Sequence, residues 1–539
     1  MNFEFDEQAL IEKKDIENPK FSDLIEKIKT AKARGVESIS SESSENMDLI
    51  KEKITGYAEQ LEKIKFDDYL KFIEPEGGDG RSFEQELDFY KECQEQGVEH
   101  KVVISYPHIN FEEEVVIKDI ELKMAKYIEI EEEVDREENV AIRNMFKEMI
   151  TISKNRIELL FKLCEFNKIE KEISEENPED INIASLLEKR ENIEDECFVL
   201  VTAIYGNLDD DLIKKAKDAS EEINRELDAD NLRSEIEETL IANKFDADDL
   251  AREFNFLFKR AGLDNCIAVV DKEKKNCETS INDQEHGGKT VIKVPEKYND
   301  PKFQINGLKL LQLLVHETTH VITGEFQLRE LGLGSINFGR NASDVKEGIA
   351  VLSEIKVTNT VLGEDRMRNK AHPYYLMAMD KIRTESNDGK GNINVGEIYD
   401  FLYEAIKRDF SKNKGFSEDQ IRGEAKKILR RVLRAVPGCR HFNTKDMIYF
   451  KGEEIAKVLE DTEYLSYVEK CYIDPELVPV FIELGIYDLS EAEQLLINGY
   501  KDALSRIVEQ GDFHKKFSDR LLWRLFARWE KLEDEEEEV

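Results

Sequence analysis

The stretch that decides how this chain is interpreted is LLQLLVHETTHVIT, residues 310–323. His316 and His320 are four residues apart, so on a helix they lie one turn apart on the same face. Two imidazoles placed in this way can bind one zinc ion, with Glu317 beside the metal-bound water. Zinc lowers the pKa of such a water toward about 7, and Glu317 can take its proton as the water attacks a carbonyl. The stretch therefore predicts a zinc-dependent hydrolase with Glu317 as the general base.

A zinc site of this kind needs a third protein ligand, and two patterns compete for it. The metzincin pattern HExxHxxGxxH would require glycine and histidine where this chain has Thr323 and Phe326, so that class is excluded. The other solution is a glutamate on a following helix. The segment DVKEGIAVLSEIKV, 344–357, has the helical pattern that this solution requires.

Glu347 is the predicted third ligand, because it would lie in the first turn of a helix capped by Ser343 or Asp344. Gly348 has no side chain, so a neighbouring helix could approach closely at this point. Glu354, seven residues further on, is the competitor for the ligand position. We expect Glu354 to have a supporting or structural role.

Composition and patterning predict an α+β fold that is predominantly helical. Among 539 residues there are only 27 Gly and 10 Pro. Apolar residues recur at helical spacing over 140–163 and 305–323. Two β-branched runs, CIAVVD at 266–271 and KTVIKV at 289–294, predict strands of a small sheet.

The charge is unevenly distributed, which predicts three regions. The net charge of −40 divides into about −33 for residues 1–250, +5 for 251–450 and −12 for 451–539. We expect an acidic helical N-terminal region (1–250), a catalytic domain (251–460) and a helical C-terminal extension with an acidic tail (461–539).

Other sequence features bear on location and partners. The chain has no apolar run of about 18 residues, no signal-peptide pattern at its start and seven scattered cysteines without a CxxC. These features predict a cytoplasmic protein with reduced thiols and no membrane span. The acidic net charge disfavours nucleic acid and anionic membranes as partners. The oligomeric state stays open.

The segment IRGEAKKILRRVLRAV, 421–436, predicts a helix with one apolar and one basic face. The apolar face has the positions Ile421, Ala425, Ile428, Leu429, Val432, Leu433 and Val436. Two interpretations of the basic face are open: it pairs with the acidic N-terminal region, or it lines a cleft and binds the carboxylate of a peptide.

Three blocks of the chain resemble the tyrosine carboxypeptidase family, which includes microtubule-associated tyrosine carboxypeptidases and bacterial proteins with a QEGLA motif. The blocks are LLVHETTHVIT (313–323), KEGIAVLSE (346–354) and RRVLRAVPGCRHFNTKDMIYFKG (430–452). The similarity covers about residues 265–460.

The resemblance implies a glutamate-zincin (gluzincin) metallopeptidase that removes a C-terminal residue from a peptide or protein. One zinc ion per chain would be held by His316, His320 and Glu347, with Glu317 as the base. Arg431, Arg434 and Lys445 would bind the substrate carboxylate. Tyr449 would stabilise the oxyanion, and His441 is a weaker candidate for that role. A basic cleft would favour acidic peptide tails.

Two departures from the family pattern concern specificity. The family has HExxxH where this chain has HExxH, and QEG where it has Lys346-Glu347-Gly348. The preference for a terminal tyrosine is therefore left open. The strand TVIKVPE, 290–296, is expected to hold an extended peptide by backbone pairing. Two alternatives stay open: another gluzincin activity, as an aminopeptidase or endopeptidase, and a non-enzymatic binding protein that zinc stabilises.

Overall fold

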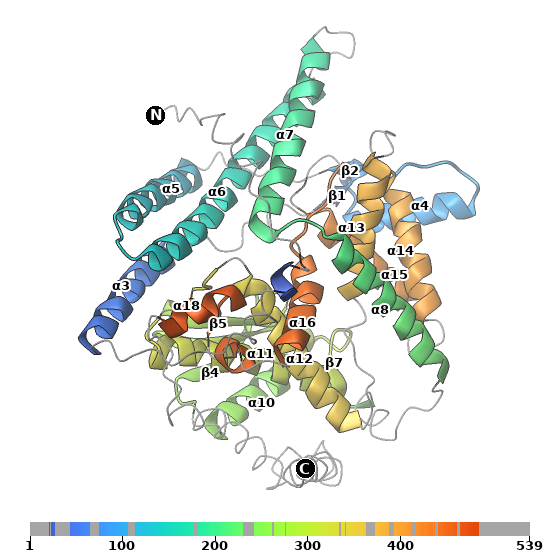
Figure 1. Ribbon diagram of the computed structural model, residues 1–539. Coiled ribbons are helices and arrows are strands. Elements are labelled where there is room, and N and C mark those ends of the chain that lie inside the picture. Colours follow the sequence, from blue (N-terminus) through green and yellow to red (C-terminus); the bar gives the residue numbers. More distant parts are fainter. Residues whose placement is uncertain are drawn as a thin grey trace.

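The computed structural model describes most of the chain between residues 21 and 483. The described residues are 21, 23–26, 44–64, 75–105, 114–175, 182–229, 242–260, 263–274, 276–333, 336–339, 341–362, 372–387, 393–410, 417–434, 436, 440–460, 464–469 and 471–483. They form a mainly helical structure with small sheets, which confirms the predicted fold class at that level (Figure 1). The acidic tail lies outside the described residues.

The N-terminal part consists of long helices. They are α3 Ser44–Lys63, α4 Phe83–Glu95, α5 Glu114–Asp135, α6 Val140–Glu175, α7 Asn182–Tyr205 and α8 Asp210–Ala229. The helices α6 and α7 pack along each other, and Figure 1 shows that their joined end projects from the rest of the molecule. Two short antiparallel strands, β1 Glu76–Gly77 and β2 Ile104–Ser105, flank α4.

A three-stranded sheet lies on one side of the central helices. Its strands are β4 Cys266–Asp271, β5 Glu278–Asp283 and β6 Lys289–Pro295, in the order β4-β6-β5. The two β-branched runs form β4 and β6, as predicted. The strand β6 pairs with β4 in parallel and with β5 in antiparallel orientation, so both of its edges are occupied. The expectation that 290–296 offers a free edge was wrong, because β5 is the outer strand on that side.

The remaining elements include the two helices that contain the predicted zinc ligands. They are β3 Lys244–Phe245, α10 Ala247–Arg260, β7 Ile305–Asn306, α11 Gly307–Glu325, α12 Ala342–Leu362, α13 His372–Asn387, α14 Val395–Phe410, α15 Glu418–Val432, α16 Met447–Glu460, α17 Tyr464–Val468 and α18 Val478–Glu483. The strands β3 and β7 pair with each other in antiparallel orientation. A single π-helical turn, Phe326–Glu330, follows α11.

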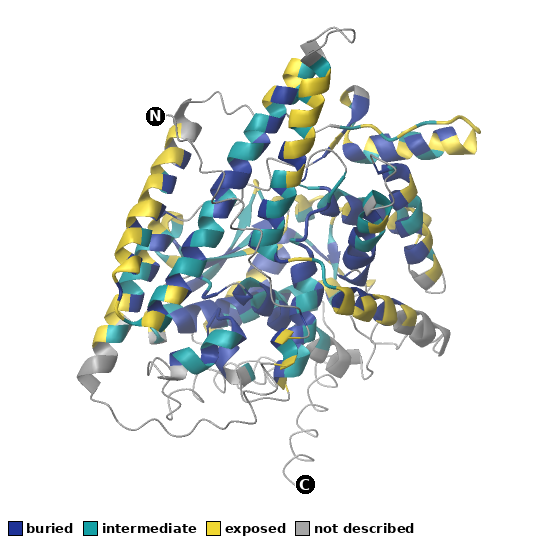
Figure 2. Ribbon diagram, turned by 45° about the horizontal axis from the view of Figure 1, so that its top comes forward, coloured by how far each residue is buried: buried dark blue, intermediate teal, exposed yellow. Residues whose placement is uncertain are grey.

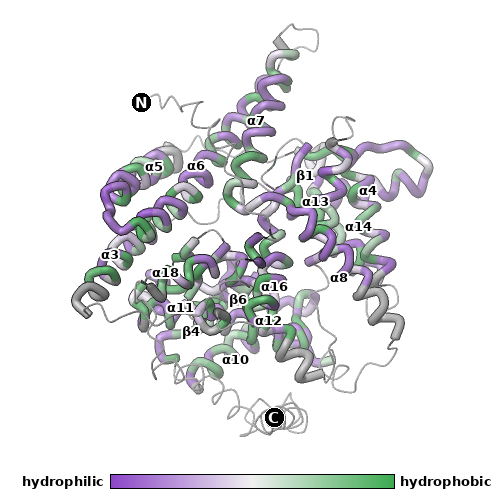
Figure 3. Tube along the Cα trace, viewed as in Figure 1, coloured by the Kyte–Doolittle hydropathy of each residue, from purple (hydrophilic) through white to green (hydrophobic). Residues whose placement is uncertain are grey.

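Two hydrophobic cores hold these elements together. The smaller core joins α10, the sheet and α11, and contains Phe254, Ile292 and Leu314. The larger core contains residues from Phe21 to Phe481, including Val345 and Ile349 of α12. Figure 2 shows buried residues concentrated at the centre and exposed ones along the outer helices. In Figure 3, hydrophilic residues dominate α4 and α8, whereas α11 and α12 are more hydrophobic.

The predicted helices agree with the structure. Most of their ends differ by a few residues, whereas the helix expected over 140–163 continues to Glu175 as α6. The helix expected over 305–323 is α11, and the helix expected over 421–436 is α15. All seven residues of the apolar face in 421–436 are buried. The predicted cap of α12 was wrong: the helix begins at Ala342, so Ser343 and Asp344 lie inside it. The boundaries of the three predicted regions stay a prediction.

Candidate metal centre

The helix α11 presents the two histidines on one face. Asn306 precedes the helix, and its side-chain oxygen accepts a hydrogen bond from the backbone N–H of Lys309 at 2.8 Å. This contact satisfies one of the free donors of the first turn. Buried Leu310 and Val321 anchor the helix in the smaller core. His316 and His320 therefore have fixed backbone positions, and their rings lie with centroids 4.7 Å apart.

The helix α12 brings Glu347 to the histidines through a backbone-to-backbone contact with α16. A Cβ atom added at Gly348 would lie 2.7 Å from the Cα of Gly452. One added at Gly452 would lie 2.9 Å from the backbone nitrogen of Gly348. Any side chain at either position would push the helices apart. Gly348 thus allows the close approach that the sequence predicts, and Glu347 is next to it in the chain.

The three predicted ligands form a triangle of the size that zinc requires. The Nε2 atoms of His316 and His320 are 3.2 Å apart. The Glu347 carboxylate lies 3.5 Å from His316 Nε2 and 3.7 Å from His320 Nε2. With zinc–ligand bonds of about 2.1 Å, tetrahedral coordination places neighbouring ligand atoms about 3.4 Å apart. The donor set and its spacing therefore fit one zinc ion with an open fourth position.

Glu354 contacts the other ring nitrogen of His316. Its Oε1 atom is 2.5 Å from Nδ1, which makes Nδ1–H the donor to a carboxylate. In the neutral ring, that arrangement leaves the lone pair on Nε2, which faces Glu347 and His320. A carboxylate behind a metal-binding histidine fixes its tautomer and raises its basicity. Glu354 is therefore placed to support His316, whereas Glu347 lies with the two histidines in a group that could hold a metal ion.

The charges of the site favour one positive charge among these groups. Burial acts to lower the pKa of His316, but hydrogen bonds to Glu347 and Glu354 raise it to about 10. Burial lowers the pKa of His320. Although burial opposes it, the two histidines hold the pKa of Glu347 well below its usual range. A proton on His316 supplies the positive charge that the carboxylates favour. A metal ion would supply that charge instead and would displace the proton.

Glu317 is buried on the same helix and contacts the sheet. Thr279 of β5 donates a hydrogen bond from its hydroxyl to Glu317 Oε2 at 2.6 Å. The residue Glu317 is 6% exposed, so this donor provides a partner where water has little access. Sequence reasoning missed Thr279, because it lies 38 residues before Glu317 in a polar stretch without a strand signal.

Tyr449 and Arg431 lie on the side of the site that α16 forms. Burial and the negative charge of Glu347 raise the pKa of Tyr449, so its hydroxyl stays protonated and can donate a hydrogen bond. The guanidinium carbon of Arg431 is 5.7 Å from the centroid of the Tyr449 ring. Arg431 also pairs with the buried Asp446 at 3.3 Å and donates to the Tyr375 hydroxyl at 3.1 Å. These partners hold the guanidinium beside Tyr449.

Comparisons with protein-family models, with curated proteins and with solved structures found no match to this chain. The resemblance to the tyrosine carboxypeptidases therefore stays a prediction that depends on the three short blocks.

The other candidate substrate residues have different surroundings. Burial lowers the pKa of Arg434, which lies one turn after Arg430 and accepts at its backbone carbonyl from the Asn443 amide at 2.8 Å. Lys445 is partly exposed, and its backbone N–H donates to Asn443 Oδ1 at 2.8 Å. Neither contact involves the histidines. His441 is 2.7 Å from Asp195 of α7 and stacks on Phe198, so it faces the N-terminal helices.

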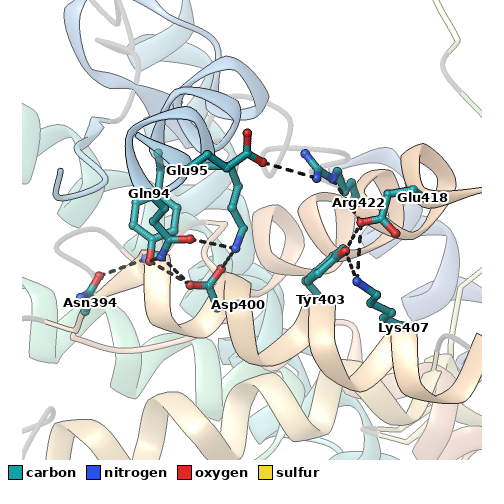
Figure 4. Close-up of polar contacts among 11 residues, drawn as sticks. Gln94, Glu95, Asn394, Asp400, Tyr403, Lys407, Glu418 and Arg422 are labelled. Carbon is teal, nitrogen blue, oxygen red and sulfur yellow. Dashed lines mark hydrogen bonds and ion pairs between the residues drawn. The ribbon is translucent and has the colours of Figure 1, made fainter. Parts of the chain in front are cut away.

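The basic residues of α15 have two kinds of partner, which correspond to the two open interpretations. Its outer residues pair with the acidic helix α4: Arg430 with Glu84 at 2.9 Å, Lys426 with Asp88, and Arg422 with Glu95 at 3.9 Å. Figure 4 shows Arg422 between Glu95 and Glu418, and also the contact of Gln94 with Asp400 of α14. Arg431 instead turns inward to Tyr375 and Tyr449.

Tyr472 and Gln327, which the sequence did not identify, hold α11 in position. Tyr472 donates its hydroxyl hydrogen bond to the backbone carbonyl of His320. Gln327, in the π-helical turn, is fully buried and accepts from the backbone N–H of Tyr472 at 2.8 Å. An inserted π turn re-aims side chains and often occurs at functional sites. A glutamine in such a turn gives no signal in a single sequence.

Among the described residues, one other cluster has the composition of a metal site. Asp283, Glu285 and His286 lie together at the end of β5. The ammonium group of Lys293 is 2.8 Å from Asp283, so a cation is already present there. This cluster is explained by its ion pair.

Proposed function

We propose that this chain is a zinc-dependent metallopeptidase, specifically a carboxypeptidase that removes a C-terminal residue. The observation that carries the proposal is the triangle of His316, His320 and Glu347, whose edges of 3.2–3.7 Å suit tetrahedral zinc. The buried carboxylate of Glu317 follows His316 directly. A structural zinc site has no need of such a base, which favours the enzyme over the binding-protein alternative.

Each group of the site would have a separate role in the reaction. Bound zinc would polarise the scissile carbonyl and lower the pKa of the attacking water. Glu317 would accept the proton of that water and later pass it to the leaving amine. Tyr449, protonated because its pKa is raised, would donate a hydrogen bond to the developing oxyanion.

The terminal carboxylate of the substrate would be recognised by Arg431. A guanidinium presents two parallel donors that match a carboxylate. Tyr449 is under the electrostatic influence of both Glu347 and Arg431, which supports a short path from the ligand triangle to this cation. An extended peptide would pair with the outer edge of β5, which no described strand occupies. Backbone pairing of this kind leaves the preferred end residue open.

The first test is the zinc content of the purified protein. We expect about one zinc per chain, and loss of zinc in His316→Ala and Glu347→Ala. Glu317→Gln should keep the metal and lose peptidase activity by a factor of about 1,000 or more. A wild-type protein that takes up no zinc when zinc is supplied would refute the proposal. Full biological activity of Glu317→Gln would instead support the binding protein.

The second test separates the peptidase classes by blocking one end of a peptide. A carboxypeptidase should cleave N-acetylated peptides and fail on peptides with a C-terminal amide. Arg431→Lys, which keeps the positive charge beside Asp446, should raise KM for free-carboxylate peptides by about tenfold or more. Arg430→Lys is the matched control, because Arg430 pairs with Glu84. Cleavage of amidated peptides would identify an endopeptidase or an aminopeptidase.

A further inference from the structure

The hydrogen bond between Thr279 and Glu317 joins the outer strand of the sheet to the predicted base. The donor is the Thr279 hydroxyl, and the acceptor is Oε2 of Glu317 at 2.6 Å. One carboxylate oxygen is thereby occupied. The carboxylate can rotate less freely, since the hydroxyl and the helix backbone both restrain it.

A second contact joins β5 to α11: the side chain of Ile281 lies against Gly324. Thr279 and Ile281 are two residues apart, so they point to the same side of the strand. Glu317 and Gly324 are seven residues apart, so they share a face of the helix. A Cβ atom at Gly324 would lie 2.7 Å from Cγ1 of Ile281, so a side chain at this position would displace that of Ile281.

The strand becomes irregular after Ser280, in the part that includes Ile281. Its pairing with β6 shifts between Ser280 and Asp283, and Asn282 has a φ of 58°. Bulges at this type of position re-aim side chains beside active sites. Up to Ser280 the pairing is regular, with Thr279 opposite Ile292 and Ser280 opposite Val291. Thr279 is therefore held by a regular ladder on one side and by α11 on the other.

We propose that Thr279 is the positioning residue for Glu317: its hydroxyl holds one carboxylate oxygen so that the other is available to the attacking water. This inference rests on the proposed function. Because the same strand presents the outer edge to a peptide, one element sets both the backbone of the substrate and the orientation of the base. A positioning role of this kind affects the rate of the chemical step more than substrate affinity.

Three variants test the proposal. Thr279→Val keeps the shape and the strand propensity and removes the donor. Thr279→Ser keeps the donor and removes the methyl group. Ser280→Ala is the matched control, because Ser280 points to the opposite side of the same strand. Each variant is assayed for kcat and KM on one peptide, with zinc content measured in parallel.

We expect Thr279→Val to lower kcat by about 10- to 100-fold, with KM and zinc content within about twofold of the wild type. Thr279→Ser should restore kcat to within about threefold, and Ser280→Ala should match the wild type. Equal losses in the valine and serine variants would overturn the proposal, since packing would then explain the effect. A wild-type kcat in Thr279→Val would overturn it as well.

A second test uses the structure of the protein and does not require bound zinc or peptidase activity. In crystals of the metal-free protein, we expect the Glu317 carboxylate to leave its present orientation in Thr279→Val and to keep it in Thr279→Ser. An unchanged carboxylate in Thr279→Val would refute the positioning role. A wild-type protein without peptidase activity would instead refute the proposed function and, with it, the catalytic meaning of this contact.

Discussion

At the scale of single residues, His316 has two ring nitrogens with different partners. Its Nε2 atom faces His320 and Glu347, and its Nδ1 atom lies 2.5 Å from Glu354. The sequence alone left two glutamates in competition for one ligand position. The geometry separates them, because only Glu347 lies within reach of both histidine Nε2 atoms.

Graded substitutions of Glu354 should weaken zinc binding without abolishing it. We expect Glu354→Gln, which can still accept from Nδ1–H, to lower zinc affinity by about tenfold. Glu354→Ala should lower it by about 100-fold, because the orientation of the ring is then lost as well. Competition with a chromogenic chelator measures both, with exposed Glu273→Gln as the control. Unchanged affinity in the alanine variant would contradict the supporting role.

The sequence identified the residues whose positions depend on helical periodicity alone. His316, Glu317 and His320 belong to one helix, so their spacing is sufficient to bring them together. Thr279 and Tyr472 reach the same site from 38 residues before Glu317 and 152 residues after His320. Thr279 and Tyr472 reach the site because separate elements pack together, and a single sequence does not show which elements do so.

At the scale of elements, the contact of α12 with α16 determines where Glu347 lies. Gly348 and Gly452 allow the two backbones to touch, and Lys451 pairs with Asp344 at 2.6 Å beside them. The sequence predicted the need for Gly348 but did not identify Gly452 as its partner. A glycine inside a helix costs about 1 kcal/mol relative to alanine, so Gly452 itself was a signal of close packing.

An added methyl group at this contact should both destabilise the protein and weaken the metal site. We expect Gly348→Ala to lower the free energy of unfolding by about 2 kcal/mol or more, and to lower zinc affinity, because the helices must separate. Gly423→Ala is the control: it lies on the exposed side of α15 with nothing within 4 Å of its added Cβ. That variant should be neutral or stabilising by up to about 1 kcal/mol. Chemical unfolding measures both, and equal effects in the two variants would contradict the packing argument.

The sequence predicted two of the three strands of the sheet. The runs CIAVVD and KTVIKV identified β4 and β6 because β-branched residues are enriched in buried strands. The outer strand β5 has the sequence ETSIND, whose polar residues lack that signal. The sequence therefore predicted a free edge at β6, whereas β5 is the outer strand on that side among the described residues.

At the scale of the whole molecule, the candidate metal site lies between the two cores. Leu314 and Val321 of α11 belong to the smaller core, whereas Val345 and Ile349 of α12 belong to the larger one. Histidines from one core and a glutamate from the other would share the ion, so zinc would join them. None of the described helices combines the length and the apolar character that a bilayer crossing requires.

Ion pairs between α8 and α13 should make the stability of this assembly depend on pH. Asp380 of α13 lies 2.8 Å from Lys217 of α8 and 2.9 Å from Arg383 of its own helix, and Arg383 in turn lies 2.7 Å from Asp210 of α8. Burial opposes the charge, but these two cations hold the pKa of Asp380 below its usual value of 3.8. Its contribution is therefore present above about pH 4 and is lost as the pH falls through the lowered pKa.

We expect Asp380→Asn to be less stable than the wild type by up to about 1 kcal/mol at neutral pH, with the difference shrinking below about pH 4. Urea unfolding of both proteins across this range measures the difference. A constant difference at all pH values would show that the carboxylate acts through packing alone. Asp211→Asn, an exposed change on α8, serves as the control.

The paired glycines of α12 and α16 also limit how this protein can change over generations. A side chain at either position would meet backbone atoms of the other helix, and backbone cannot be exchanged for something smaller. No second substitution can compensate for the first, so the usual route of coupled replacement is closed. Lineages that retain the metal triangle should keep glycine at both positions, and lineages that lose one glycine should lose the ligand set with it.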